Sequence, residues 1–329
     1  MVSIKDVAKE AGVSVATVSR VINDSGTVTE ATRKNVLDVI DRLGYKPNLF
    51  GKGLRRSGTK IIMVMLSSLA NTFCSSVSRA IDKAAEKNGY YTVVCTTDGN
   101  EDKERYYINF ACNGLFDGLI VLNSTLDKIG VEKLAERIPV VQCNEYVNTR
   151  VAPHVSIDNH SAAYDAVNLL IQNGRRKIVL FTADNNLVST CERHNGYKKA
   201  LADNGIRYDK ELILQGNYGY RNAIRVFEDF LNTGKEFDGV FAISDRMAAG
   251  AVRVLLSSGY KVPYDAEVIG FDNTDISYTT TPQLSTVSQP HTLLGKNAFD
   301  LMEKLFENKT AESIVVPHKI IERGSTKQH

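Results

Sequence analysis

A short segment near the N-terminus places a polar and basic surface beside an apolar helical face. Val18, Val21 and Ile22 recur at helical spacing and would face a core, with Ser14 as the helix cap. The residues left on the outer side of this helix are Val15, Ala16, Ser19 and Arg20. A helix can enter the major groove of DNA, where an arginine can donate two hydrogen bonds to guanine. This segment is therefore predicted to contact DNA bases.

Two neighbouring helices would position this segment. Ser3 can cap a first helix with Asp6 three residues later, and Gly12 makes the turn that follows. Thr29 can cap a third helix that ends at Gly44. The apolar faces predicted for these two helices comprise Ile4, Val7, Ala8, Ala11, Val36, Leu37, Ile40 and Leu43. The first sixty residues thus predict a helix-turn-helix head followed by a short basic hinge.

The charge of the chain is divided in the same way. Residues 1–60 contain eleven Lys and Arg against six Asp and Glu, a balance of +5, whereas the remaining residues have a balance of −3. Positive charge concentrated on the part with groove-reading geometry favours a nucleic-acid partner.

The rest of the chain alternates strand-like apolar runs with helical patterns. This alternation predicts an α/β body in which helices cover parallel sheets. The expected strands are residues 61–66, 91–95, 118–122, 139–143, 178–182, 239–243 and 267–271.

The body contains an internal echo. The run Phe116–Asn123 (FDGLIVLN) matches Phe237–Ser244 (FDGVFAIS), which suggests two similar lobes. Ligands of open α/β sheets bind beyond the carboxyl ends of the strands. A small molecule is therefore expected between the strand ends at Asn123 and Ser244.

Length and composition fit a multi-domain protein without cofactors. The 329 residues suffice for two or three domains, and the five cysteines include no CxxC pair, so neither a disulfide framework nor a metal site is expected. The N-terminus lacks the apolar segment of a signal peptide, and no apolar run approaches the ~20 residues of a membrane span. We expect a cytoplasmic protein with no membrane partner.

Two other classes of function compete with DNA-dependent regulation. An enzyme would need a catalytic motif such as GxSxG, GxxxxGK[ST], HExxH or suitably arranged paired carboxylates, and the sequence shows none. A cytosolic or transport-linked sugar-binding protein would fit the two-lobed body, but the N-terminal head argues against it. Binding of operator DNA in a gel shift separates these classes.

The head and body together resemble a known family. The runs Ile4–Asn23 (IKDVAKEAGVSVATVSRVIN) and Leu43–Asn48 (LGYKPN) resemble the lactose/galactose-repressor family of bacterial transcription regulators. The resemblance implies a helix-turn-helix head over residues 1–46, a hinge helix or linker over 47–59, and a periplasmic-binding-protein-like body over 60–329. The N-lobe would comprise mainly residues 60–158 and the C-lobe mainly 159–288, with crossovers back within 288–329.

The resemblance also implies which residues contact DNA. They are Ser14, Val15, Ala16, Thr17, Ser19, Arg20, Asn23, Tyr45, Asn48 and Leu54. Leu54 would be wedged into the minor groove at the centre of a palindromic operator, with the two heads of a homodimer on its half-sites.

The effector-binding residues implied by the resemblance come from both lobes. They are Asn71, Phe73, Asn123, Asn144, Arg193, Tyr218, Ser244, Asp245 and Asp272. Aromatic faces, hydroxyl acceptors and one cation at strand ends suit a polyol-like ligand. Each residue also has a structural alternative: helix capping for Asn71, Asn123 and Asp245, core packing for Phe73, a surface ion pair for Arg193, and a structural role for Asp272.

Three segments resemble the cytidine-repressor branch of the family. They are residues 143–146 (CNEY), 156–168 (SIDNHSAAYDAVN) and 320–326 (IIERGST). A nucleoside or pentose is the favoured effector, with hexoses and sugar phosphates as alternatives. Effector binding between the lobes would change the affinity for operator DNA, in a direction that the sequence leaves open.

Overall fold

The computed structural model describes residues 2–22, 26, 28–45 and 58–327. These residues form two compact units, residues 1–59 and 60–329. The expected hinge, residues 47–59, lies almost entirely outside the described residues, so its helix stays a prediction. Within the described residues, no helix combines the length and the apolar composition that crossing a membrane requires.

The N-terminal unit is a small helical head. Its helices are α1 (Ile4–Ala11), α2 (Val15–Ile22) and α3 (Glu30–Leu43). Ser3 and Asp6 form the expected capping box, and both α1 and α3 end at a glycine in the left-handed region, where the lack of a Cβ avoids strain. The helices meet in a core around Val7, Val18 and Val36, which are fully buried.

One core position predicted for the head is wrong. Leu37 was expected on the apolar face of the third helix, but 47% of its surface is exposed, whereas Val39 is buried. Successive helical residues lie about 100° apart, so a residue next to Val36 turns away from the stripe that Val36, Val39 and Ile40 form.

The first lobe of the body is built on a parallel sheet. The strand order is β11-β5-β4-β3-β1-β2. The strands are β1 (Ile61–Leu66), β2 (Tyr91–Thr96), β3 (Gly118–Val121), β4 (Val140–Cys143), β5 (His154–Ile157) and β11 (Ile314–Val316). The helices are α5 (Thr72–Lys87), α6 (Glu101–Ala111), α7 (Lys128–Ala135) and α13 (His291–Phe306).

The second lobe repeats this plan. Its sheet has the order β12-β10-β9-β8-β6-β7, with β12 antiparallel to β10 and the other pairs parallel. The strands are β6 (Ile178–Thr182), β7 (Ile213–Gln215), β8 (Gly239–Ala242), β9 (Glu267–Asp272), β10 (Ser285–Ser288) and β12 (Lys319–Ile321). The helices are α8 (Asn159–Gln172), α9 (Val188–Asp203), α10 (Tyr220–Asn232), α11 (Asp245–Ser257) and α12 (Ile276–Thr279), with a 3-10 turn η1 (Lys210–Leu212).

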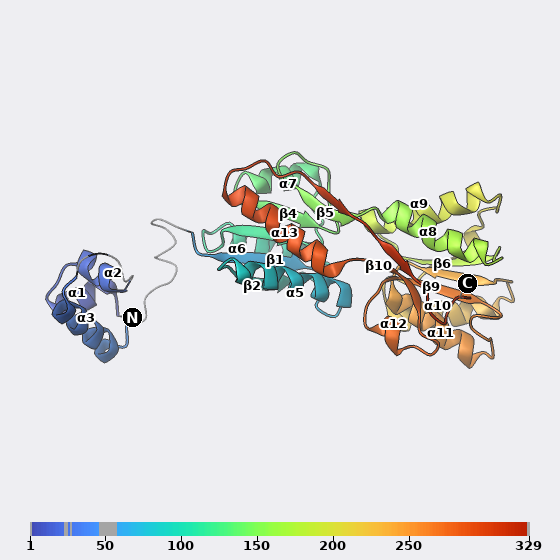
Figure 1. The fold of residues 1–329 in the computed structure, drawn as a ribbon, viewed down its shortest axis with the longest axis horizontal. Coiled ribbons are helices and arrows are strands. Elements are labelled where there is room, and N and C mark those ends of the chain that lie inside the picture. Colours follow the sequence, from blue (N-terminus) through green and yellow to red (C-terminus); the bar gives the residue numbers. More distant parts are fainter. Residues whose placement is uncertain (1, 23–25, 27, 46–57, 328–329) are drawn as a thin grey trace. The chain divides into compact units, whose positions relative to one another are not determined.

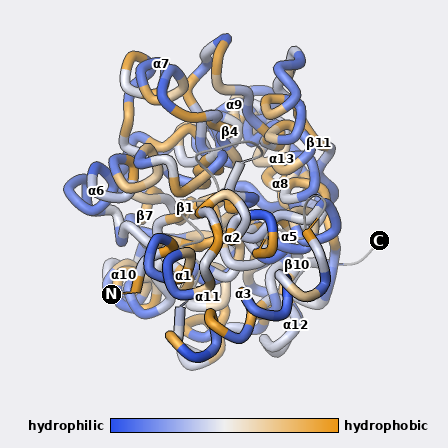
Figure 2. The backbone as a smooth tube through the Cα atoms, turned by 90° about the vertical axis from the view of Figure 1, so that its left-hand side faces the viewer, coloured by the Kyte–Doolittle hydropathy of each residue, from blue (hydrophilic) through white to orange (hydrophobic). Residues whose placement is uncertain are grey.

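Helices cover both faces of each sheet (Figure 1). Along β1 the side chains alternate between two cores: Ile62 and Val64 face the α5 and α13 side, while Met63 and Met65 face the α6 and α7 side. Hydrophilic and hydrophobic residues alternate along the helices in Figure 2, as expected where one helix face is buried. The predicted α/β architecture with parallel sheets is confirmed.

The chain passes between the lobes at three places. It crosses after β5 into α8, after β10 into α13, and between β11 and β12. Residues 291–316 thus complete the first lobe and residues 319–327 the second.

Candidate functional site

The outer side of α2 carries the residues predicted to contact bases. Ala16 and Arg20 are exposed, and Val15 retains 39% of its surface exposure in spite of being apolar. Val18 and Val21 on the opposite side are buried. The head therefore fixes the helix from behind and leaves this face open.

The other residues predicted to contact DNA fall into three groups. Ser14 accepts a hydrogen bond from the Thr17 backbone N–H at 3.1 Å, so it caps α2, and the two hydroxyls lie 2.9 Å apart. Ser19 is half-buried, and Tyr45 packs against the head core. Asn23, Asn48 and Leu54 lie outside the described residues and stay predictions.

The two lobes enclose a cavity of about 240 Å³. Its walls come from the carboxyl ends of strands in both sheets and from the helices that follow them. Eight of the nine residues predicted to bind an effector line it: Asn71, Phe73, Asn123, Asn144, Arg193, Tyr218, Ser244 and Asp272. We call this space the effector pocket.

Two neutral amides, Asn71 and Asn123, line the first-lobe side of the pocket. The Asn71 side-chain oxygen accepts hydrogen bonds from the backbone N–H groups of Phe73 and Cys74 and thereby caps α5. The Asn123 side-chain oxygen lies 3.3 Å from the Ser67 hydroxyl, which donates to it. No hydrogen bond among the described residues uses the Nδ2 group of either asparagine, so both can donate to a ligand. Capping is thus one role of Asn71, alongside its place in the pocket wall.

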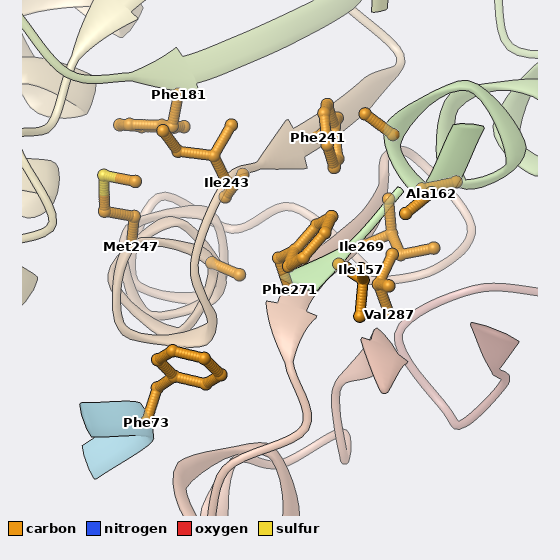
Figure 3. Close-up of a cluster of buried hydrophobic side chains, with 14 of the residues drawn as sticks. Phe73, Ile157, Ala162, Phe181, Phe241, Ile243, Met247, Ile269, Phe271 and Val287 are labelled. Carbon is orange, nitrogen blue, oxygen red and sulfur yellow. The ribbon is translucent and has the colours of Figure 1, made fainter. Parts of the chain in front are cut away.

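An aromatic ring from the first lobe closes one side of the pocket. Figure 3 shows Phe73 extending from the start of α5 toward the second-lobe side chains that include Met247 and Phe271. Only 4% of Phe73 is exposed, and its ring meets that of His291 edge-on at 5.2 Å. Phe73 therefore packs in the core and still lines the pocket.

The second-lobe wall is charged. Arg193 on α9 is 3% exposed, its Nε donates to the Asn159 side-chain oxygen at 2.9 Å, and its Nη1 donates to the Ile243 carbonyl at 2.7 Å. The guanidinium lies 3.6 Å from the centre of the Phe271 ring. No hydrogen bond among the described residues uses Nη2, which leaves one edge of this fixed cation for a ligand.

Asp272 lies beside this cation at the end of β9. Its Oδ1 accepts a hydrogen bond from the Gln289 amide at 2.7 Å and lies 3.8 Å from Nη1 of Arg193. Burial raises the pKa of Asp272 to about 6, although the positive charge of Arg193 acts in the opposite direction. Its backbone has φ +108°, in the region that side chains rarely adopt, so the surrounding contacts must hold this conformation.

Ser244 and Tyr218 complete the predicted second-lobe wall. The Ser244 hydroxyl accepts from the Met247 backbone N–H at 3.4 Å and caps α11. The Tyr218 hydroxyl lies 2.8 Å from that of Thr190 on α9. Both side chains are therefore held in place by their own lobe.

Asp245 is the exception among the predicted effector residues. Its carboxylate accepts hydrogen bonds from the Thr274 backbone N–H at 2.6 Å and from the Thr286 hydroxyl at 2.5 Å, and only 1% of the residue is exposed. It does not line the effector pocket. The carboxylate instead joins the loop after β9 to α11 and β10, which favours the structural alternative for Asp245 over ligand contact.

Three of the pocket-wall residues that sequence reasoning missed form hydrogen bonds between the lobes. Glu145 follows Asn144, and its carboxylate accepts hydrogen bonds across the cleft from the backbone N–H and hydroxyl of Ser189. Arg246 donates to the Ala70 carbonyl of the other lobe at 2.8 Å. Ser189 and Arg246 were within reach of the sequence, because Ser189 lies one helical turn before Arg193 and Arg246 follows Asp245.

The arrangement suits binding of a small polar molecule. The wall contains two cations, Arg193 and Arg246, and two carboxylates, Asp272 and Glu145, so donors and acceptors for a ligand are mixed. Among the described residues, no group of His, Cys, Asp and Glu could hold a metal ion.

Comparisons with known proteins agree with this geometry. The model of the bacterial regulatory proteins of the lacI family matches residues 3–48. The model of periplasmic binding proteins and sugar binding domain of the LacI family matches residues 59–323. Catabolite control protein A of Priestia megaterium is 36% identical over 330 residues and covers 99% of both chains. The transcriptional repressor PurR of Vibrio atlanticus is 32% identical and also covers 99% of both.

Solved structures of similar proteins extend over the same length. The lac repressor dimer bound to operator and the anti-inducer ONPF has a TM-score of 0.84 at 26% identity, covering 99% of each chain. The complex of the transcriptional regulator CelR with cellobiose has a TM-score of 0.75 at 28% identity, covering 99% of this chain and 100% of that one. The chain therefore belongs to the lacI family of bacterial regulatory proteins, as a DNA-binding transcriptional regulator with a sugar-binding type of effector domain.

Proposed function

We propose that this protein is a cytoplasmic homodimeric repressor, and not an enzyme, whose two heads bind the half-sites of a palindromic operator. The observation that carries the proposal is the convergence of eight predicted residues on one cavity between two lobes, in a chain that also has an exposed α2 face. Similarity to a lac repressor dimer on operator DNA supports the dimer. Two-fold symmetry of the protein matches a palindromic site.

The effector is proposed to be a nucleoside or pentose, with other sugars as alternatives. The amide donors of Asn71 and Asn123 and the charged pair Arg193 and Asp272 face the same space from opposite lobes. Vicinal hydroxyl groups can donate to Asp272 and accept from Arg193 at once. A ligand that joins both walls favours one relative position of the lobes and can change operator affinity reciprocally. The preference for a nucleoside rests on the sequence segments around Asn144 and Asp158.

The DNA contacts are proposed on the α2 face and in the hinge. Arg20 contacts a base, Val15 and Ala16 lie against the groove, and Leu54 enters the minor groove from the hinge. The charge of the head fits this arrangement because phosphate contacts supply most of the non-specific affinity.

The experiment that tests this function combines operator selection with two arginine variants. Selection of bound duplexes from a random DNA library by the full-length protein should give a palindromic sequence. Arg20→Ala should then relax specificity at one position of each half-site, worth ~1–3 kcal/mol of discrimination. Arg42→Ala is the matched control, because the substitution removes the same charge from another part of the head. Arg42 pairs with Glu10 at 2.8 Å. Equal loss of affinity for operator and scrambled DNA in Arg20→Ala would make Arg20 a phosphate contact.

A further inference from the structure

A second hollow lies beside the crossover from β5 to α8. Its volume is about 520 Å³, which is within the range of roughly 300–1,000 Å³ that small-molecule sites occupy. Its walls come from the segment after β4, the β5–α8 crossover, α9 and β11, and it shares no lining residue with the effector pocket. We call it the crossover cavity.

The two cavities share α9 as a common wall. Ser189 and Arg193, one helical turn apart, line the effector pocket, while Val188 and Glu192, also one turn apart, line the crossover cavity. Residues four apart lie on the same face of a helix, so adjacent faces of one helix serve the two cavities.

One buried side chain connects the two spaces directly. Asn159 lines the crossover cavity and is 3% exposed. Its side-chain oxygen accepts the hydrogen bond from Nε of Arg193 at 2.9 Å. A molecule in the crossover cavity therefore touches the residue that holds the cation of the effector pocket.

The charged lining of the crossover cavity is mainly acidic. Asp158 and Glu192 line it together with His160, and no lysine or arginine does so among the residues that the structure describes. The Asp158 carboxylate accepts hydrogen bonds from the Ser161 backbone N–H at 2.9 Å and hydroxyl at 2.7 Å, and so caps α8. The half-buried Glu192 carboxylate takes part in none of the hydrogen bonds or ion pairs found among the described residues.

Aromatic and aliphatic surfaces face the same space. The Tyr146 ring stacks on the His154 ring with centres 3.7 Å apart and planes inclined by 3°, so one face of Tyr146 is covered. Burial raises the pKa of Tyr146, and the negative charges of Glu192 and Asp158 act in the same direction, against a hydrogen bond with Ser156. Val188 and Val315 supply apolar walls, and Val315 is 62% exposed at the rim.

We propose that the crossover cavity is a second ligand site, specific for small organic cations that carry an ammonium or guanidinium group. The cation lies against the free Glu192 carboxylate and near the electron-rich ring of Tyr146, and the hydrocarbon part of the ligand lies on Val188 and Val315. A carboxylate without a partner in a hollow free of positive side chains selects such a ligand over an anion. The site stands independently of the effector proposed above.

Calorimetric titration of the full-length protein tests this proposal. Putrescine and agmatine serve as cationic probes and 1,4-butanediol as the neutral match for putrescine, at pH 8 where histidine is neutral. At least one of the two amines should bind, and the diol should not. Glu192→Gln should weaken amine binding at least tenfold, whereas Glu228→Gln, which removes an exposed carboxylate on α10, should leave it unchanged.

Two further variants keep the outcome decisive. Val315→Trp at the exposed rim should block amine binding without disturbing the fold, because the new ring fills the cavity mouth. Asp272→Ala should leave amine binding intact, because that residue belongs to the other cavity. The proposal is overturned if neither amine binds up to about 10 mM, a range that covers weak metabolite affinities. It is equally overturned if Glu192→Gln binds as tightly as the unmodified protein, or if Asp272→Ala rather than Glu192→Gln abolishes binding.

Discussion

The two lobes share one architecture but present different chemistry to the cleft. In both, the aspartate of the repeated FDG run binds the backbone N–H at the start of the first strand of its sheet: Asp117 binds Lys60 at 2.8 Å, and Asp238 binds Lys177 at 2.8 Å. The first lobe then offers the amides of Asn71 and Asn123, because its one carboxylate in the pocket wall, Glu145, is bonded to Ser189, whereas the second offers Arg193 and Asp272.

The difference lies in how firmly these groups are held. Arg193 is fixed by Asn159, the Ile243 carbonyl and the Phe271 ring before any ligand arrives. Asn71 and Asn123 of the first lobe each keep an Nδ2 group that no hydrogen bond among the described residues uses. Arg193 is already ordered in the folded protein, so ligand binding does not have to offset the entropy of ordering it. The amides of Asn71 and Asn123 can then form hydrogen bonds to the ligand when the lobes close around it.

Among these substitutions, Arg193→Ala is expected to lower effector affinity the most. It removes a charge-assisted bond to the ligand, worth about 1.5–3 kcal/mol, and also leaves Asp272 without its cation. Effector binding measured by calorimetry should weaken at least tenfold, while operator binding without effector survives. Arg225→Ala on α10, whose exposed side chain donates to Asn222, is a control that should behave as the unmodified protein. Unchanged effector affinity in Arg193→Ala would remove this residue from the site.

The helix packing of each lobe depends on one glycine. A Cβ at Gly196 on α9 would overlap the His160 carbonyl oxygen, and a Cβ at Gly295 on α13 would overlap Ala80 and the backbone of Ile81 on α5. Gly196→Ala and Gly295→Ala should each lower the free energy of unfolding by about 1–3 kcal/mol, since packed backbone cannot yield. Urea denaturation measures both values.

The control for this pair is Gly130→Ala on α7, where the nearest neighbours are side-chain atoms of Leu126 and Asp127 at 3.1–3.3 Å, with no backbone among them. If Gly196→Ala proved as stable as the unmodified protein while Gly295→Ala did not, the close α8–α9 contact of the second lobe would be incorrect.

The pH dependence of effector binding should follow Asp272. Its pKa is raised to about 6, so the carboxyl becomes protonated as the pH falls through 6 and accepts hydrogen bonds from ligand hydroxyls less well. Effector affinity should therefore fall by up to about tenfold per pH unit below pH 6. Burial also lowers the pKa of the neighbouring His291, while burial and the negative charge of Asp272 raise the pKa of Asp245 to about 7.

Calorimetry between pH 5 and pH 8 measures this profile in three proteins. Asp272→Asn should bind more weakly and show a flat profile. Asp300→Asn, in which an exposed carboxylate on α13 loses its pair with Lys296, should keep the original profile. A profile in Asp272→Asn as steep as in the unmodified protein would assign the titration to another group.

Asn123→Ala should have the smallest effect. It removes a single neutral hydrogen bond to the ligand, worth ~0.5–1.5 kcal/mol, from the first-lobe wall. The effector dissociation constant should rise roughly three- to tenfold, less than in Arg193→Ala. A loss equal to that of Arg193→Ala would show that the two walls contribute alike, and the contrast between the lobes would fail.

Strands and caps were readable from the sequence because they rest on local patterns. Residues 61–66 and 178–182 match β1 and β6 to the residue, and the capping box at Ser3 is formed as expected. Short strands such as β7 and β12 were missed, since three residues carry too little periodicity to be recognised. Their place is fixed by pairing with distant strands.

The pocket residues were predictable where a family motif lies at the end of a strand. They were less predictable where the direction of a side chain decides whether the residue lines the pocket. Asp245 begins α11 and Asp272 ends β9, yet hydroxyls of Thr286 on β10 and of Thr274 in the loop after β9 hold the Asp245 carboxylate away from the pocket. Glu145 would point away from the cleft if the strand alternation continued past Asn144. Asn144 instead has φ +72°, which breaks the alternation and brings both Asn144 and Glu145 to the pocket wall.

Operator affinity with and without effector tests most directly whether the pocket between the lobes controls DNA binding. A thermal-shift screen of pentoses, hexoses and nucleosides identifies the ligand, because binding to the folded state raises the melting temperature. Fluorescence anisotropy on the selected operator then compares the unmodified protein with Asp272→Ala. The account predicts that the ligand changes the operator dissociation constant of the unmodified protein by at least about fivefold, the lower end of typical coupling between sites. It also predicts no change in Asp272→Ala, with equal affinities of the two proteins in the absence of ligand. An unaltered response of Asp272→Ala to the ligand would contradict it.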